Sequence, residues 1–129
     1  MSYTIDRTFN GETFDAIVER TRTALGKHGF GVLTEINVAA TLKAKIGAEI
    51  DPYLILGACN PTMANEAIKL EPRIGAMLPC NVIIRATPGD EVMVSAVDPE
   101  ASMQAIPNRD LHNVAGQVRD MLKGVVDDI

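Results

Sequence analysis

The chain has 129 residues, of which 47% are hydrophobic and 22% are charged, the composition of an ordinary globular domain. Its net charge of -5 and its scattered Lys and Arg residues argue against binding to the nucleic-acid backbone. The N-terminus lacks the basic stretch and apolar run of a secretory signal, and no apolar stretch approaches the ~18 residues of a membrane helix. We therefore expect one cytoplasmic domain over residues 1–129, with no nucleic-acid or membrane partner.

The first part of the chain predicts strands and helices in alternation. Tyr3–Phe9 alternates apolar and polar residues, which predicts a half-buried strand. Apolar residues then recur at helical spacing over Phe14–Leu25. Phe30–Ile36 predicts a second strand, and Val38–Ile46 predicts a short helix that ends at Gly47.

The middle of the chain predicts a buried strand followed by a helix. Tyr53–Cys59 is apolar on both parities, which predicts a central strand covered on both sides. Asn60 is a favourable cap and Pro61 a favourable first residue for the helix that follows. Pro72 stops this helix, because proline cannot continue the hydrogen-bonded ladder.

The last part predicts a hairpin and a long helix. Val82–Ala86 and Val92–Val97 predict two strands, and Thr87–Asp90 between them is a turn by composition. Asn108 or Asp110 caps a final amphipathic helix, which is the most periodic stretch of the chain. A hairpin, further strands and two long amphipathic helices together predict an α+β sandwich.

The chain has only two cysteines, and each is followed by an asparagine: Cys59-Asn60 and Cys80-Asn81. The predicted cap and Pro61 place Cys59 just before a helix N-terminus, where amide groups and the helix dipole stabilise a thiolate. Cys80 has the parity of the core residues of its strand, which indicates a buried thiol. The candidate thiol or ligand site therefore comprises both cysteines and both asparagines.

Whether the two thiols meet depends on how their strands are arranged. Cys59 ends one predicted strand and Cys80 begins a later one. If the strands are antiparallel neighbours the thiols lie at the same end of the sheet, and if they are parallel the thiols lie at opposite ends. A disulfide requires Cα atoms within about 7 Å.

A soft-metal site is a further option. Met63 lies one helical turn after Cys59, and Met77 lies three residues before Cys80. Thiolates and thioethers suit Cu(I). No metal motif is present, so no metal is expected, and Met63 equally suits the core side of its helix.

Four segments carry a resemblance to a known family: Gly29–Leu33, Thr41–Lys43, Leu56–Pro61 and Leu78–Val82. Their sequence and order resemble the domain of unknown function 302 family over nearly the whole chain. The resemblance implies an α+β fold similar to the TATA-box-binding-protein-like arrangement, in the order strand, helix, four mostly antiparallel strands, helix. It thereby favours proximity of the two cysteines. It implies neither a reaction nor DNA binding, because fold does not carry function.

These observations predict a cytoplasmic binding or sensing domain whose two thiols act as a redox pair or bind a soft small-molecule ligand. The alternatives are a structural or protein-interaction module with inert buried cysteines and an enzyme of unknown reaction. No particular cofactor is indicated. A homodimer is expected, because several strands are apolar on both parities and an antiparallel sheet in a small domain leaves one face in need of cover.

Overall fold

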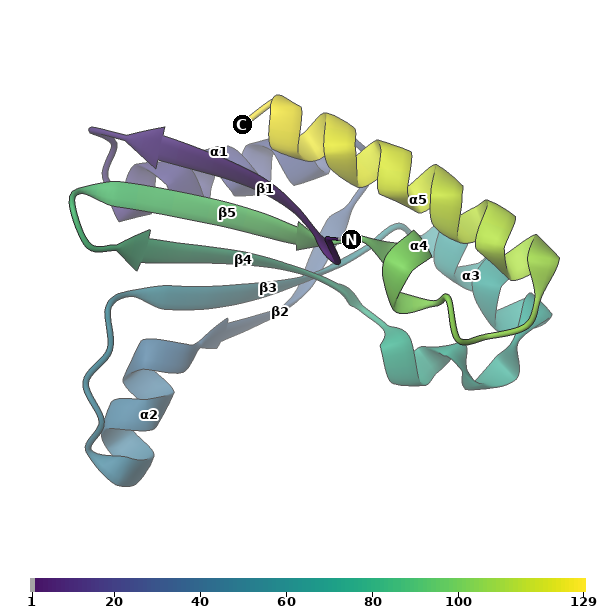
Figure 1. The fold of residues 1–129 in the computed structure, drawn as a ribbon, viewed down its shortest axis with the longest axis horizontal. Coiled ribbons are helices and arrows are strands. Elements are labelled where there is room, and N and C mark those ends of the chain that lie inside the picture. The colour runs from purple at the N-terminus through teal and green to yellow at the C-terminus, as the bar shows by residue number, and fades with distance from the viewer. Residues whose placement is uncertain (1) are drawn as a thin grey trace.

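The computed structural model describes residues 2–129, which form one antiparallel β-sheet with helices packed against it (Figure 1). The strands are, in chain order, β1 (Thr4–Asn10), β2 (Gly31–Asn37), β3 (Tyr53–Cys59), β4 (Cys80–Thr87) and β5 (Glu91–Val97). Their order across the sheet is β1-β5-β4-β3-β2, and every neighbouring pair is antiparallel. Strands β1 and β2 are therefore the two edges.

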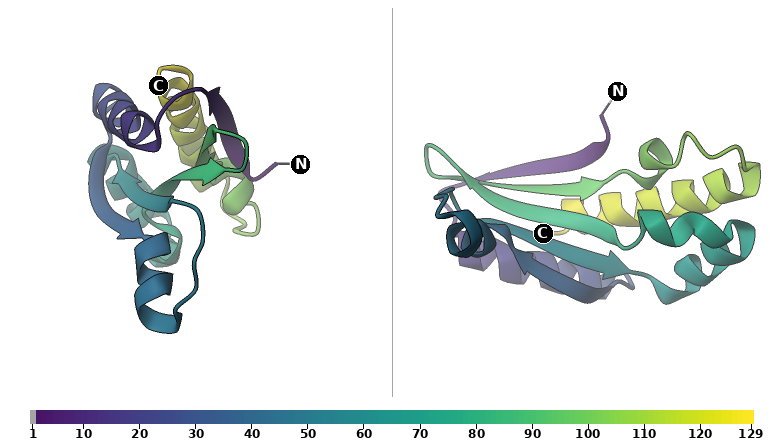
Figure 2. Two further views of the ribbon diagram at one scale, coloured as in Figure 1. Left: turned by 90° about the vertical axis from the view of Figure 1, so that its left-hand side faces the viewer. Right: turned by 90° about the horizontal axis from the view of Figure 1, so that it is seen from below.

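The helices are, in chain order, α1 (Phe14–Lys27), α2 (Val38–Ile46), α3 (Pro61–Leu70), the 3-10 helix η1 (Pro72–Met77), α4 (Pro99–Ser102) and α5 (Arg109–Asp127). The long helices α1 and α5 lie on the same side of the sheet, and α2 projects away from the body (Figure 1, Figure 2). The predicted α+β fold is thus confirmed, and the order strand, helix, four strands, helix holds once the shorter helices are set aside. Within residues 2–129, no helix combines the length and the hydropathy needed to span a bilayer.

The core lies between the sheet and its helices. Alternate residues of β3 and β4 face this layer, and Leu56, Val82 and Ile84 have no exposed surface. They belong to one hydrophobic cluster with Ile17 of α1 and Leu111 of α5, which are equally buried. Each such side chain contributes about 1.5–3 kcal/mol by leaving water, so this layer is the main stabilising element.

Helix α5 begins at a cap that also ties two helices together. The Asn108 Oδ1 atom accepts a hydrogen bond from the Leu111 amide at 3.0 Å, so Asn108 rather than Asp110 is the cap. The Asn108 Nδ2 atom donates to the Leu70 carbonyl at the end of α3, also at 3.0 Å. The contact holds the N-terminal half of α5 beside α3, at the end of the sheet that carries both cysteines.

The structure departs from the sequence-based prediction in two respects. Helices η1 and α4 were not expected, because each is too short for helical periodicity to show in the sequence. The prediction that β3 is covered on both sides holds for one face only. Leu54 and Leu56 are buried under the helices, whereas Tyr53 and Ile55 on the opposite face are half-buried.

Gly57 is buried in β3 at a point where neighbouring segments approach closely. A Cβ atom there would collide with the Thr34 hydroxyl and lie 2.7 Å from Cγ of Pro79. We expect Gly57→Ala to lower the free energy of unfolding by about 1–3 kcal/mol, because β2 or the Pro79 segment must shift. Urea unfolding followed by circular dichroism measures this.

Gly26→Ala is the matched control. A Cβ atom at Gly26, in α1, meets nothing within 4 Å. The added methyl group should leave stability unchanged or raise it by up to about 1 kcal/mol, through the lower entropy of the unfolded chain. Equal losses in the two variants would contradict the steric explanation.

Candidate functional site

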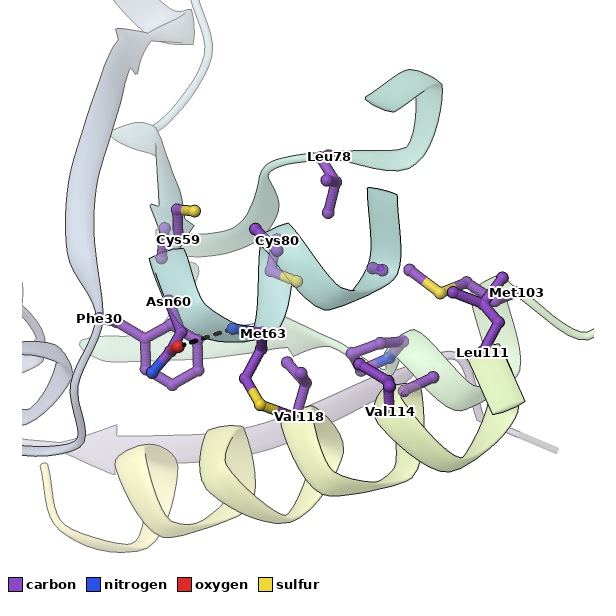
Figure 3. A pocket seen from close by; sticks show the side chains of 15 residues that line it. Phe30, Cys59, Asn60, Met63, Leu78, Cys80, Met103, Leu111, Val114 and Val118 are labelled. Atoms are coloured by element: carbon purple, nitrogen blue, oxygen red, sulfur yellow. Dashed lines mark hydrogen bonds between the residues drawn. The ribbon is translucent and has the colours of Figure 1, made fainter. Parts of the chain in front are cut away.

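Antiparallel pairing brings the two cysteines to the same end of the sheet. Ala58 of β3 lies directly opposite Cys80 of β4, and Cys59 is the next residue along β3. Of the two arrangements that the sequence allowed, the antiparallel one is therefore present. Both cysteines line one cavity, which lies between β3, β4, α3 and α5 (Figure 3).

The two thiols point in different directions. Cys80 shares its face with Ala58, so strand alternation directs Cys59 toward the other face. Figure 3 shows the Cys80 sulfur on the α5 side of its strand and the Cys59 sulfur turned away from α5. Both are free cysteines. A disulfide between them requires backbone movement, because the side chains do not face each other.

Asn60 performs the capping role that its sequence context predicts. Its Oδ1 atom accepts a hydrogen bond from the Met63 amide at 3.1 Å, and Pro61 is the first residue of α3. The Asn60 Nδ2 atom donates to the Gly29 carbonyl at 3.1 Å. Because this side chain joins the start of α3 to the turn before β2, it also fixes the position of Cys59 beside the helix N-terminus.

The environments of the two thiols differ strongly. Cys80 is 7% exposed, and Cys59 is half-buried. Burial, and to a smaller extent the charge of the neighbouring Cys59 thiolate, raise the pKa of the Cys80 thiol from 9.0 to about 11. Cys80 is therefore a protonated thiol at neutral pH, although it lies close enough to Cys59 for the two charges to interact.

The cavity is small, apolar and rich in sulfur. Its volume is about 30 Å³, which suits a water-sized occupant rather than a drug-sized one. Besides the two cysteines, Met63 of α3 and Met103 after α4 line it, and Figure 3 shows the Met103 side chain between α3 and α5. Its most polarisable atoms are therefore sulfurs.

The structure brings together only part of the predicted site. Asn60 and Met63 line the cavity with the cysteines, whereas Asn81 is exposed on the opposite face of the sheet and Met77 is 43% exposed outside the cavity. Met103 takes the place that the sequence suggested for Met77. Nothing in the sequence around Met103 indicated this, since α4 is too short to show a period.

For other residues that line the cavity, the apolar pattern of the sequence indicated a place in the core and not in a site. Helix α5 contributes one stripe at helical spacing, formed by Leu111, Val114 and Val118. Phe30, at the turn before β2, closes the cavity beside Asn60. Within residues 2–129, no group of three or more His, Cys, Asp or Glu side chains is arranged to hold a metal ion. A metal with three or more side-chain ligands at this site would therefore need thioether ligands in addition to the thiols.

Comparison with known proteins identifies the family. Residues 5–129 match the domain of unknown function DUF302, so the chain belongs to this family. The structure is similar to the crystal structure of an uncharacterized conserved DUF302 protein from Bacillus stearothermophilus. The TM-score is 0.91 at 22% sequence identity, over 99% of this chain and 98% of that chain. At this identity the likeness shows a shared fold. A search of curated proteins found no match.

The two thiols should differ in reactivity. At pH 8 only roughly a thousandth of the Cys80 side chains carry the reactive thiolate, and the sulfur is buried. We expect Cys80 in a Cys59→Ser variant to react with Ellman's reagent at least ~100-fold more slowly than Cys59 in a Cys80→Ser variant. Both should react alike in urea. Equal rates in the folded proteins would show that Cys80 is accessible.

The raised pKa of Cys80 also predicts a dependence of stability on pH. The folded state holds the thiol proton up to pH about 11, whereas the unfolded state releases it near 9.0. The resulting stability is present below pH 9 and is lost as pH rises through 11, by on the order of 2 kcal/mol. Urea titrations of metal-free protein at pH 8 and pH 11 measure the loss. Cys80→Ala should lose less over the same interval, and an equal loss would contradict the assignment to Cys80.

Proposed function

We propose that this protein is a binding or sensing domain for a compact, soft ligand held in the cavity beside Cys80. The observation that carries the proposal is the lining: sulfur-bearing side chains from β4, α3 and the segment after α4 line one small apolar space. The sulfurs of Cys80, Met63 and Met103 form a donor set that suits a soft, thiophilic ion such as Cu(I). Cys59 lies at the rim and is the more accessible thiol.

The proposal includes the cytoplasm as compartment and a homodimer as the assembly. The cytoplasm keeps thiols reduced, as a site built on two free cysteines requires. The homodimer follows from the apolar residues on the outer face of the sheet.

A structural or protein-interaction module with inert cysteines is the second candidate. The burial of Cys80 and its raised pKa favour it, because free cysteine often behaves as a small hydrophobic core residue. The two candidates differ in one measurable respect. A ligand-binding domain takes up a soft ion at the cavity, whereas the inert module does not.

The test uses protein purified without oxygen, and Cu(I) is the probe. Competition with bicinchoninate should reveal one tightly bound Cu(I), and native mass spectrometry should show the same stoichiometry. Met103→Leu should weaken binding at least ~10-fold, because it removes a thioether while keeping the volume. Cys80→Ser should weaken it further.

Met77→Leu is the matched control, since Met77 lies outside the cavity and should leave Cu(I) affinity unchanged. Circular dichroism should confirm that each variant is folded. Absence of Cu(I) binding by the natural sequence, together with a ligand-free mass, would support the inert module. Equal weakening by Met77→Leu and Met103→Leu would show that the ion binds elsewhere.

A further inference from the structure

The face of the sheet opposite α1 and α5 has an apolar centre on β3, β4 and β5, with polar residues around it. At this centre, the cross-strand pairs between β3 and β4 are Tyr53 with Arg85 and Ile55 with Ile83, and Met93 of β5 lies beside Arg85. All five of these side chains are half-buried, although neither α1 nor α5 lies over them. An antiparallel sheet with one solvated face normally carries polar residues there. This pattern therefore indicates a surface that is covered in the functional protein.

A shallow depression on this face crosses β1, β5 and β4. Ser95 of β5 lies in it and is only 8% exposed, because larger neighbours surround its short side chain. At the edge, Tyr3 is 73% exposed. Asp6 and Arg85 both line the depression, from β1 and β4 on either side of β5.

These two charged groups have no ionic partner within residues 2–129. Arg85 Nη2 donates only to the Met93 sulfur, a weak acceptor, at 3.0 Å. The Asp6 carboxylate accepts a single hydrogen bond from Thr4 Oγ1 at 3.2 Å. Neither belongs to an ion pair in the described part of the chain. A half-buried guanidinium without a carboxylate partner is energetically unfavourable, and a carboxylate from a second protein chain would stabilise it.

Arg85 is also the only strand residue that presents a positive charge on this face. The other basic residue of the five strands, Arg7 of β1, points the opposite way and donates to the carbonyls of Val126, Asp127 and Ile129 at the end of α5. The outer face thus presents one positive group and, across β5, the negative Asp6. A surface with this distribution is complementary to itself.

We propose that the outer face of the sheet is the interface of a homodimer in which Arg85 of each subunit pairs with the partner's Asp6. Asp6 lies opposite Ser95, and Arg85 lies opposite Met93, so the two charges flank β5 from its two sides. A two-fold axis through the depression at β5 exchanges these positions and forms the ion pair twice. The same contact covers Ile83 and Met93.

This inference rests on the homodimer of the proposed function. It is independent of the cavity, since Cys80, Met63 and Met103 line the cavity from the helix-covered side of the sheet. The two can therefore fail separately. A dimer that binds no Cu(I) would leave this interface intact, and a monomer that binds Cu(I) would leave the cavity intact.

Light scattering after size exclusion, over a concentration series, tests the interface. The natural sequence should elute as a dimer. Asp6→Arg and Arg85→Asp should each raise the dissociation constant at least ~10-fold, because like charges then face each other. The double variant Asp6→Arg, Arg85→Asp should restore the dimer, since the pair is re-formed with its signs exchanged.

The control exchanges two exposed charges on α1, Asp15→Arg with Lys27→Asp, and should leave the dimer unchanged. Met103→Leu in the cavity should likewise remain dimeric. Circular dichroism confirms folding of each variant. A monomer at every concentration, single variants that dimerise like the natural sequence, or a folded double variant that fails to recover would each overturn the proposal.

Discussion

The register of β3 against β4 is the constraint on which the rest of the molecule depends. With Ala58 opposite Cys80, the end of one strand meets the start of the other, and the two cysteines arrive at one end of the sheet. The N-terminus of α3 follows directly from that end. A shift of one residue would turn Cys80 outward and Asn81 inward, and the cavity would lose its buried thiol.

The close approach at Gly57 helps to hold this register. Thr34 of β2 and Pro79, just before β4, both lie against the bare Cα of Gly57, two residues before Cys59. A side chain there would separate the strands next to the cysteines. The Asn60 cap then connects the same end of the sheet to the turn at Gly29, so local sterics and two hydrogen bonds position the site.

The two faces of the sheet have different chemical characters, and the two proposals use one face each. The helix-covered face is a dry core whose packing leaves one small, sulfur-lined space. The outer face carries isoleucines beside charged groups that form no ion pair within residues 2–129. Because side chains alternate along each strand, neighbouring residues such as Cys80 and Asn81 belong to these different environments. A single sheet can in this way separate ligand binding from assembly.

The sequence by itself determined the local elements of this protein. Apolar periodicity identified the strands and long helices, the proline and asparagine at the start of α3 marked its first residue, and Asn108 was one of two caps suggested for α5. Cys80 has the same parity as Val82, which indicated that Cys80 is buried. Asn81 has the opposite parity, which corresponds to the outward direction that the structure shows. These properties depend on residues within a few positions of one another, which a single segment encodes.

Only the tertiary structure decided which segments meet. The sequence suggested Met77 as a neighbour of the cysteines, and the structure places Met103 there instead, because the lining comes from β4, α3, α4 and α5 packing together. The sequence also predicted that β3 is covered on both sides, and the structure covers only one, because apolar residues on both parities do not specify which face the helices pack against. Both outcomes depend on contacts between residues far apart in the chain. These contacts are stabilised by the burial of apolar surface between distant segments, which the pattern within one segment does not specify.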